Sequence, residues 1–319
     1  MTIYGICLRG IVMAKLTAEK IAELKGQGFI MQRDKEHFVC RIVTVDGTMD
    51  SKKIRKVAEI SEKYGEGHMT FTSRLSIEIR GIKYEDIDKV KDELKEVGLY
   101  AGGTGARVRP IASCKGTVCV WGLLDTQELS RIIHERFYEG WYDVKLPHKF
   151  KIAVGGCPNN CAKPDLNDLG IMGQRKPKLD QDRCLGCKKC AVEETCKAGA
   201  AKRVDNKMNI DFDKCRKCGQ CIGKCHFDAV ELDKEGVKIF LGGKWGKLPR
   251  VGDLVNNIFT VEEALEFIEK SILYYKEYGK DGERFGDMID RIGFEQVEKV
   301  LLTNEMMDRK EEILSAQSM

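Results

Sequence analysis

The 319-residue sequence has no long apolar run and no strong excess of charge of either sign. Its largest apolar stretches, such as 38–45, are far shorter than the roughly 20 residues that a membrane-spanning helix needs. The N-terminus has no basic segment followed by a long apolar one, so no secretory signal is predicted. Basic residues (54) and acidic residues (50) are interleaved, which disfavours a nucleic-acid interface. We therefore expect a cytoplasmic protein without membrane or nucleic-acid partners.

Cysteine, in contrast, is abundant. The chain has 14 cysteines, and 12 of them lie between Cys114 and Cys225. A disulfide framework would require a small exported scaffold, and this chain is neither small nor visibly exported. Thiols at short, regular spacings in such a chain predict bound metal.

Hydrophobic periodicity and capping residues predict an α+β fold. In the first hundred residues the order of elements is β-α-β-β-α, which is typical of a compact half-domain. The expected elements are a helix over 17–25, a strand over 38–45, a helix from 50 or 51 to 64, strands over 68–73 and 75–82, a helix over 84–98, a helix over 126–138, a buried strand over 149–156, a strand over 237–243 and a helix over 261–278.

Between about residues 177 and 236 the composition changes to short, cysteine-dense segments typical of loops. This change predicts a small module inserted into a larger domain. The resulting division is an N-terminal extension and helix (1–28), a half-domain (29–100), a larger domain (101–176 with 237–319) and the inserted module (177–236).

The inserted module carries two cysteine motifs, C-x2-C-x2-C-x5-C from Cys184 and C-x2-C-x2-C-x3-C from Cys215. Paired structural zinc sites are the alternative, but they usually separate their C-x2-C pairs by 12 or more residues. The motifs resemble those of bacterial two-cluster ferredoxins, in which the fourth cysteine of each motif ligates the other cluster. That resemblance implies two [4Fe–4S] clusters. Cluster one would take Cys184, Cys187, Cys190 and Cys225, and cluster two would take Cys215, Cys218, Cys221 and Cys196.

A second group of cysteines comprises the pairs Cys114/Cys119 and Cys157/Cys161. Taken alone, this group could hold zinc or a single cluster. The segment GGCPNNC, which follows a basic strand, resembles the siroheme–[4Fe–4S] site of sulfite and nitrite reductases. The resemblance implies a third [4Fe–4S] cluster on these four cysteines and a role for Cys161 as the bridge to the siroheme iron. The first pair is C-x4-C here, whereas the family usually has C-x5-C.

Basic residues match the family's substrate-facing positions. Arg74 lies in a TSR segment, Arg109 precedes the first cysteine pair, and Lys149 and Lys151 lie two residues apart on the expected strand, so they should share a face. The resemblance implies that these four side chains meet an oxyanion. Binding of the siroheme carboxylates is expected from Arg107, Lys244, Lys247 and Arg250.

The chain is thus expected to have a sulfite reductase-like half repeat with an inserted ferredoxin-like domain. The resemblance implies six-electron reduction of sulfite to sulfide, with an external ferredoxin or flavoprotein subunit as electron donor. Because the family fold contains two such halves, it also implies a homodimer or a pairing with a paralogous chain. Reduction of nitrite or another oxyanion, and a siroheme-free electron-transfer subunit, remain alternatives.

Overall fold

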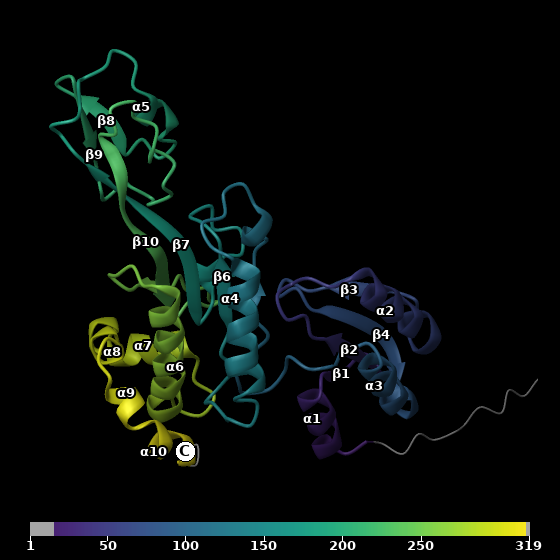
Figure 1. Ribbon diagram of the computed structural model, residues 1–319. Coiled ribbons are helices and arrows are strands. Elements are labelled where there is room, and N and C mark those ends of the chain that lie inside the picture. Colours follow the sequence, from purple (N-terminus) through teal and green to yellow (C-terminus); the bar gives the residue numbers. More distant parts are fainter. Residues whose placement is uncertain (1–15, 317–319) are drawn as a thin grey trace, which may run out of the picture.

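The computed structural model describes residues 16–316, which form a half-domain, a larger domain and a module at the end of a long β-ribbon (Figure 1). The first fifteen residues, which include most of the expected N-terminal extension, lie outside the described part. Within residues 16–316 no helix is both long and apolar enough to cross a membrane.

The half-domain is an antiparallel four-stranded sheet with two helices packed on it. Its strand order is β1-β2-β4-β3. Helices α2 and α3 bury Val57 and Leu94 against strand residues such as Phe38 and Ile79. The elements are α1 (Ala18–Gly26), β1 (Phe29–Met31), β2 (His37–Ile42), α2 (Ser51–Tyr64), β3 (Met69–Phe71), β4 (Ile77–Lys83), a 3-10 turn (Tyr84–Asp86) and α3 (Ile87–Lys95).

The expected helices of the half-domain begin where capping residues predicted them. The Thr17 hydroxyl accepts the Lys20 N–H, and the Asp50 carboxylate accepts the Lys53 N–H. Helix α2 ends at Gly65, as predicted. The short strand β1 was not predicted, because three residues are too few to show an alternating pattern.

The larger domain contains a five-stranded mixed sheet of order β11-β10-β7-β6-β5. Strands β5, β6 and β7 are parallel, and β7, β10 and β11 are antiparallel. The strand expected over 149–156 is shorter in the structure, where β6 spans Ile152–Gly155. The sheet elements are β5 (Ala112–Ser113), β6 (Ile152–Gly155), β7 (Leu169–Leu179), β10 (Val230–Leu241) and β11 (Asp253–Leu254), with 3-10 turns at Gly116–Val118 and Pro164–Leu166.

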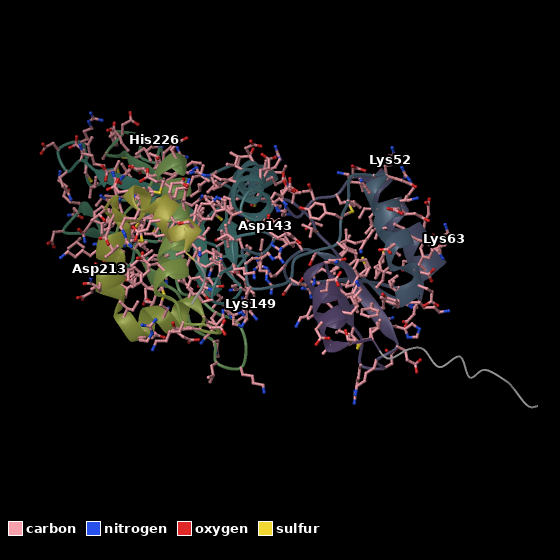
Figure 2. The ribbon with its side chains drawn as sticks, turned by 90° about the horizontal axis from the view of Figure 1, so that it is seen from below. Lys52, Lys63, Asp143, Lys149, Asp213 and His226 are labelled. Carbon is pink, nitrogen blue, oxygen red and sulfur yellow. The ribbon has the colours of Figure 1, made fainter. Side chains whose placement is uncertain are left out.

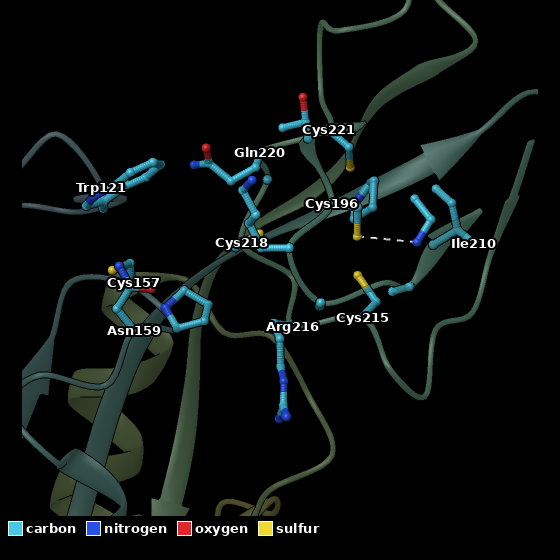
Figure 3. Close-up of a pocket in the computed structure, with 18 of the residues that line it drawn as sticks. Trp121, Cys157, Asn159, Cys196, Ile210, Cys215, Arg216, Cys218, Gln220 and Cys221 are labelled. Atoms are coloured by element: carbon cyan, nitrogen blue, oxygen red, sulfur yellow. Dashed lines mark hydrogen bonds between the residues drawn. The ribbon is translucent and has the colours of Figure 1, made fainter. Parts of the chain in front are cut away.

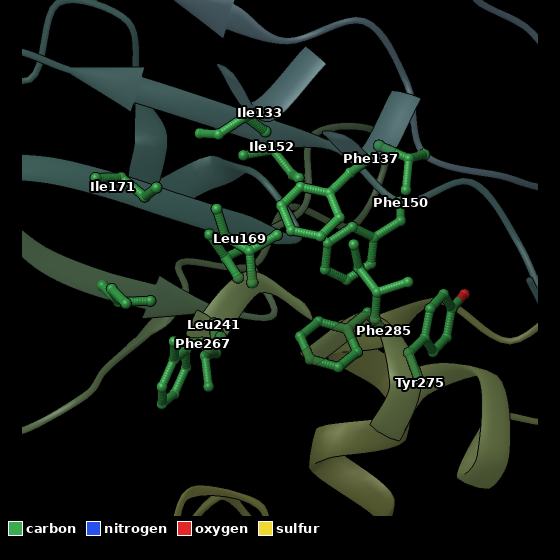
Figure 4. Packing of buried hydrophobic residues seen from close by; sticks show 14 of the residues in the cluster. Ile133, Phe137, Phe150, Ile152, Leu169, Ile171, Leu241, Phe267, Tyr275 and Phe285 are labelled. Carbon is green, nitrogen blue, oxygen red and sulfur yellow. The ribbon is translucent and has the colours of Figure 1, made fainter. Parts of the chain in front are cut away.

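Helices enclose this sheet and build the main core. Side chains of β6, β7 and β10 meet aromatic rings of the C-terminal helices, among them Phe267, Tyr275 and Phe285 (Figure 4). The expected helix over 126–138 is an α-helix to Ile133 that continues as a π-helical turn. The helices are α4 (Thr126–Ile133), the π-turn (His134–Glu139), α6 (Val261–Tyr278), α7 (Phe285–Ile292), α8 (Phe294–Leu301), α9 (Glu305–Asp308) and α10 (Lys310–Ser315).

Strands β7 and β10 form a ribbon that extends beyond the rest of the sheet. They pair from Leu169–Leu241 at the core to Leu179–Val230 at the outer end. The segment 180–229 between them holds α5 (Ala191–Thr195), β8 (Ala201–Val204) and β9 (Lys207–Ile210) around a small core of its own. The cysteine-dense module therefore lies at the tip of the ribbon, on the far side of the larger domain from the half-domain (Figure 1).

Candidate functional site

Both cysteine quartets expected in the module line cavities. Cys184, Cys187, Cys190 and Cys225 surround a small one. Each quartet contains three cysteines from one motif and the fourth from the other. This exchange brings together the same sets that the ferredoxin resemblance implied.

The second module quartet, Cys196, Cys215, Cys218 and Cys221, lines a cavity of about 620 Å³ (Figure 3). Burial, followed by the neighbouring Cys215 and Cys218 thiols, raises the pKa of the Cys221 thiol to about 11. Gly219 makes the tight turn possible, because its φ of +70° is in the left-handed region and a Cβ there would lie 2.8 Å from Arg175 Cβ. Thiols with raised pKa values stay protonated on their own and lose their protons when they bind a positive metal centre.

The third quartet lies at one edge of the mixed sheet. Cys114 directly follows β5 and Cys157 comes two residues after β6, and these strands are parallel neighbours, so the two cysteines come together. The Gly156 N–H donates to Cys114 Sγ at 3.1 Å. Burial raises the pKa of Cys157, the Asn159 N–H opposes that rise, and the Cys114, Cys161 and Cys119 thiols add to it. All four thiols are therefore close enough to interact.

One cysteine of the third quartet lines the cavity of the second module quartet. Cys157 and Trp121 line the same cavity as Cys218 (Figure 3). The first module quartet lines a different cavity, which contains no residue of the sheet edge. The three quartets are thus ordered, with the Cys215 set between the Cys184 set and the Cys114 set.

The four cysteines of each module quartet line one cavity. In residues 16–316 no three Cys, His, Asp or Glu side chains converge tightly enough to hold one metal ion. A zinc ion would hold its thiolates at about 2.3 Å. Three cysteines at C-x2-C-x2-C spacing favour an iron–sulfur cluster over zinc.

Five cations line a second kind of cavity, of about 280 Å³, between the half-domain and the larger domain. Four of them, Arg74, Arg109, Lys149 and Lys151, are the residues singled out from the sequence. The fifth, Arg41, was missed. Arg41 is half-buried on β2, where its side chain pairs with Glu78 at 2.7 Å. Its only sequence signal was a single charged position in an apolar strand.

Arg74 is held rigidly in this basic pocket. Its guanidinium donates to Asn167 Oδ1 at 2.8 Å and to the carbonyl oxygens of Pro110 at 2.6 Å and Ile152 at 3.2 Å. Its Nε is buried and has no hydrogen-bond partner among the described residues. Burial lowers the pKa of Arg74 to about 10. A guanidinium held in this way adds a fixed positive charge to the pocket, which favours a bound anion.

The other cations of the basic pocket are similarly confined. Arg109 donates to the carbonyl oxygens of Gly105 at 3.0 Å and Gly103 at 2.5 Å, and burial lowers its pKa to about 10. Burial also lowers the pKa of Lys149. Burial, followed by the charges of Arg74 and Arg284, lowers the pKa of Lys151 to about 8. Crowded cations of this kind favour binding of an anion.

One buried carboxylate supports the basic pocket. Asp168 is fully buried, accepts two hydrogen bonds of 2.8 Å from Arg284 Nη2 and accepts the Lys151 backbone N–H at 2.9 Å. Burial raises the pKa of Asp168, while Arg284 and the Lys151 N–H oppose that rise. No sequence pattern pointed to this pair, because 116 residues separate its members.

The basic pocket and the third quartet lie at opposite ends of β6. Lys151 immediately precedes the strand and Cys157 comes two residues after it. At about 3.3 Å per residue the two positions are roughly 20 Å apart along the chain.

The four residues expected to bind siroheme carboxylates are not gathered into this pocket. Arg107 stacks on the Tyr142 ring at 4.0 Å. Lys244 pairs with Asp287 at 2.5 Å, and Arg250 pairs with Asp290 at 2.8 Å. Lys247 is exposed.

Two family models match the chain. The model described as nitrite and sulphite reductase 4Fe-4S domain matches residues 104–310, and the model described as nitrite/sulfite reductase ferredoxin-like half domain matches residues 30–97. The chain therefore belongs to the nitrite and sulfite reductase family.

Similar proteins include a coenzyme F420-dependent sulfite reductase of Methanocaldococcus jannaschii, 32% identical over 84% of this chain and 42% of the relative. The chain thus spans less than half the length of that enzyme. It is also 32% identical to the protein MJ0551 of the same organism, over 85% of this chain and 92% of the relative. The dissimilatory-type sulfite reductase subunit alpha of Allochromatium vinosum is 26% identical, over 83% of this chain and 69% of the relative.

Solved structures confirm the expected α+β sulfite reductase-like fold. The crystal structure of dissimilatory sulfite reductase I aligns with a TM-score of 0.67 and 22% identity, covering 84% of this chain and 69% of the other. The Mycobacterium tuberculosis NirA protein aligns with a TM-score of 0.63 and 14% identity, covering 92% of this chain and 48% of the other.

Proposed function

We propose that the chain is an oxidoreductase that reduces sulfite to sulfide with six electrons, using siroheme and three [4Fe–4S] clusters. The observation that carries the proposal is the basic pocket of five cations, combined with three ordered cysteine quartets. An electron carrier alone has no need for Arg74 and Lys151 in a confined pocket. Several relatives named as sulfite reductases support the same substrate.

In this proposal the basic pocket binds the substrate. Arg74 and Arg109 neutralise its oxygens and fix its orientation, since their guanidinium groups are already held by backbone carbonyl oxygens. Lys151 Nζ, with a pKa of about 8, is protonated at neutral pH and can transfer a proton to an oxygen that leaves as water. Lys149 keeps the site positive as its neighbour loses that proton.

The cysteine quartets would hold the clusters, with Cys161 bridging one of them to siroheme, which supplies the iron centre for multi-electron reduction. Arg107, Lys244, Lys247 and Arg250 remain proposed ligands of the siroheme carboxylates. Lys244 and Arg250 would then share their charge with Asp287 and Asp290, respectively. We further propose the domain boundaries given above, with 177–236 as the inserted cluster module.

We propose that each active site is composite, with the basic pocket of one chain facing Cys161 of a second copy or of a paralogous chain. The support is the separation of roughly 20 Å between Lys151 and Cys157 along β6 within one chain. A two-fold symmetric pair would complete both sites at once.

The composite site can be tested by mixing two impaired variants, Lys151→Met and Cys161→Ala, after separate purification and joint dissociation and reassociation. Half of the pairs would then combine one subunit of each kind, and each such pair would hold one intact site. Activity should recover to about a quarter of wild type for a two-fold pair. No recovery, despite demonstrated subunit exchange, would show that each chain builds its site alone.

The function itself is tested on protein purified without oxygen from cells able to make siroheme. We expect siroheme absorption bands and about twelve cluster irons in addition to the siroheme iron. Turnover of sulfite and nitrite with reduced methyl viologen would then separate the two substrates. Nitrite is the second candidate, because a relative named as a nitrite reductase is 27% identical over 80% of this chain. Cluster absorption without siroheme bands would instead identify an electron-transfer subunit.

A further inference from the structure

The outer end of the module presents an exposed apolar patch at the cavity of the Cys184 quartet. Leu185 and Phe227 line that cavity and are nevertheless 66% and 45% exposed. Cys187, a member of the same quartet, is itself exposed. This patch is therefore the point at which a cluster in the cavity lies nearest to solvent.

Lysines rim this patch. Lys188 and Lys189 lie between Cys187 and Cys190, and Lys224 directly precedes Cys225, so each is one peptide unit from a quartet cysteine, about 3.8 Å between Cα atoms. All three are exposed, and none has an ion pair among residues 16–316. Leu185, Lys188, Lys189, Lys224 and Phe227 are called the cluster-one face below.

The acidic residues of the module do not neutralise this rim, because several are engaged elsewhere. Glu193 binds Arg203 at 2.9 Å, Asp180 binds Arg183 at 3.3 Å, and Asp211 binds Lys214 at 2.7 Å. The segment 180–229 as a whole contains eleven Lys and Arg residues and eight Asp and Glu residues. These three carboxylates are therefore not available to neutralise Lys188, Lys189 and Lys224.

The position of this face in the chain of quartets gives it a role. The Cys215 quartet shares its cavity with Cys157, whereas the Cys184 quartet does not. Electrons that enter at the Cys184 quartet would therefore pass through the whole series before they reach the sheet edge. The cluster-one face is also remote from the half-domain, since His226 beside it and Lys52 on α2 lie at opposite ends of the molecule (Figure 2).

We infer that the cluster-one face is the docking surface for a small one-electron carrier protein with an acidic surface, and that Lys188, Lys189 and Lys224 steer it there. The inference rests on the proposed function and specifies where its external donor binds. An apolar centre with a charged rim is the usual anatomy of a transient interface. In the transfer step one electron leaves the reduced carrier, which is oxidised, and enters the cluster, which is reduced. No bond or proton need move.

The test compares two triple variants with the same change in net charge. Lys188→Glu/Lys189→Glu/Lys224→Glu reverses the rim, and Lys52→Glu/Lys83→Glu/Lys299→Glu reverses three exposed lysines on other elements. The holoprotein is reduced in a stopped-flow instrument by an acidic bacterial two-cluster ferredoxin, and binding of the oxidised ferredoxin is measured by calorimetry. The second-order rate constant for the rim variant should fall at least about tenfold at low salt, and the control should stay near wild type.

Two further measurements separate the possible failures. The difference between rim variant and wild type should shrink at high salt, because screening weakens the steering. Reduced methyl viologen, which is a cation, should support sulfite reduction by the rim variant at least as well as by wild type. If wild type does not reduce sulfite with reduced methyl viologen, the proposed function is refuted. Normal viologen activity with equal ferredoxin binding and reduction rates for both triple variants would overturn the docking surface alone.

Discussion

Replacing Asp168 with asparagine should show how the basic pocket is held together. The substitution keeps the size of the side chain but removes its charge, which leaves Arg284 without a counterion. The Arg284 side chain is only 12% exposed, so its charge is poorly solvated. Breaking a buried ion pair of this kind destabilises a protein by about 3–5 kcal/mol. We expect about 3 kcal/mol for Asp168→Asn, because the asparagine oxygen can still accept one hydrogen bond.

The same substitution should change the pH dependence of substrate binding. Asp168 raises the pKa of Lys151, which is already lowered to about 8 by burial and by neighbouring cations. Without that carboxylate, the pKa of Lys151 falls further. Anion binding requires the protonated lysine, so the loss of sulfite affinity that wild type shows as the pH rises through about 8 should begin at a lower pH.

The assay measures the shift of chemical unfolding midpoints and the pH profile of kcat/KM for sulfite on the same preparations. A double-mutant cycle with Arg284→Met should show a combined cost smaller than the sum of the single costs, since no buried charge remains unpaired. The matched control is Glu269→Gln, which removes another buried carboxylate, one that pairs with Lys310 at 2.7 Å and with Arg136. If kcat/KM of Asp168→Asn and of wild type falls at the same alkaline pH, then Asp168 does not raise the pKa of Lys151 as proposed.

Other substitutions test separate parts of the molecule. Lys151→Met should lower kcat/KM for sulfite at pH 7 by about tenfold to a hundredfold, and it should flatten the fall above pH 8; an unchanged profile would exclude this lysine as the titrating group. Cys196→Ser should lose about four irons per chain, whereas Cys40→Ala should lose none, as iron assays on both would show. Glu269→Gln should lower the free energy of unfolding by about 1 kcal/mol, because Arg136 and Lys310 remain partly exposed, and it should not move the pH profile. Thr260→Ala removes the capping box of α6 and should cost about 1 kcal/mol, and an unshifted unfolding midpoint would contradict that role.

The sequence predicted elements whose signals are local. Helix α2 was found because a cap at Asp50 coincides with hydrophobic periodicity, and α6 was predicted with its observed bounds. Strand β7 gave no such signal, since its inner half is buried throughout and its outer half contains Pro177. The outer half of β10 is charged and exposed, so only its inner part, from Val237, was predicted. A ribbon that leaves the core is stabilised by backbone pairing, which does not depend on an alternating pattern of side chains.

The candidate site likewise has one part that local sequence patterns predict and another part that they do not. Cysteine spacing is a local property, and the structure brings the expected quartets together. The basic pocket depends on contacts between the half-domain and the larger domain, and the family resemblance supplied four of its cations. Arg41 and the Asp168–Arg284 pair could not be predicted, because their roles arise only when distant segments pack together.

One short strand places the two halves of the proposed chemistry. Strand β6 has only four residues and is completely buried, so its position in the sheet is fixed from both faces. Its first end sets Lys151 among the cations, and its other end sets Cys157 beside Cys114. Any shift of β6 would move the anion site and the cluster site together. Where two such chains pair, this rigid spacing would keep substrate and cluster in register across the interface. Asp168, which pairs with Arg284, also binds the Lys151 backbone N–H at the start of β6. This buried pair therefore anchors the strand from which both sites are positioned.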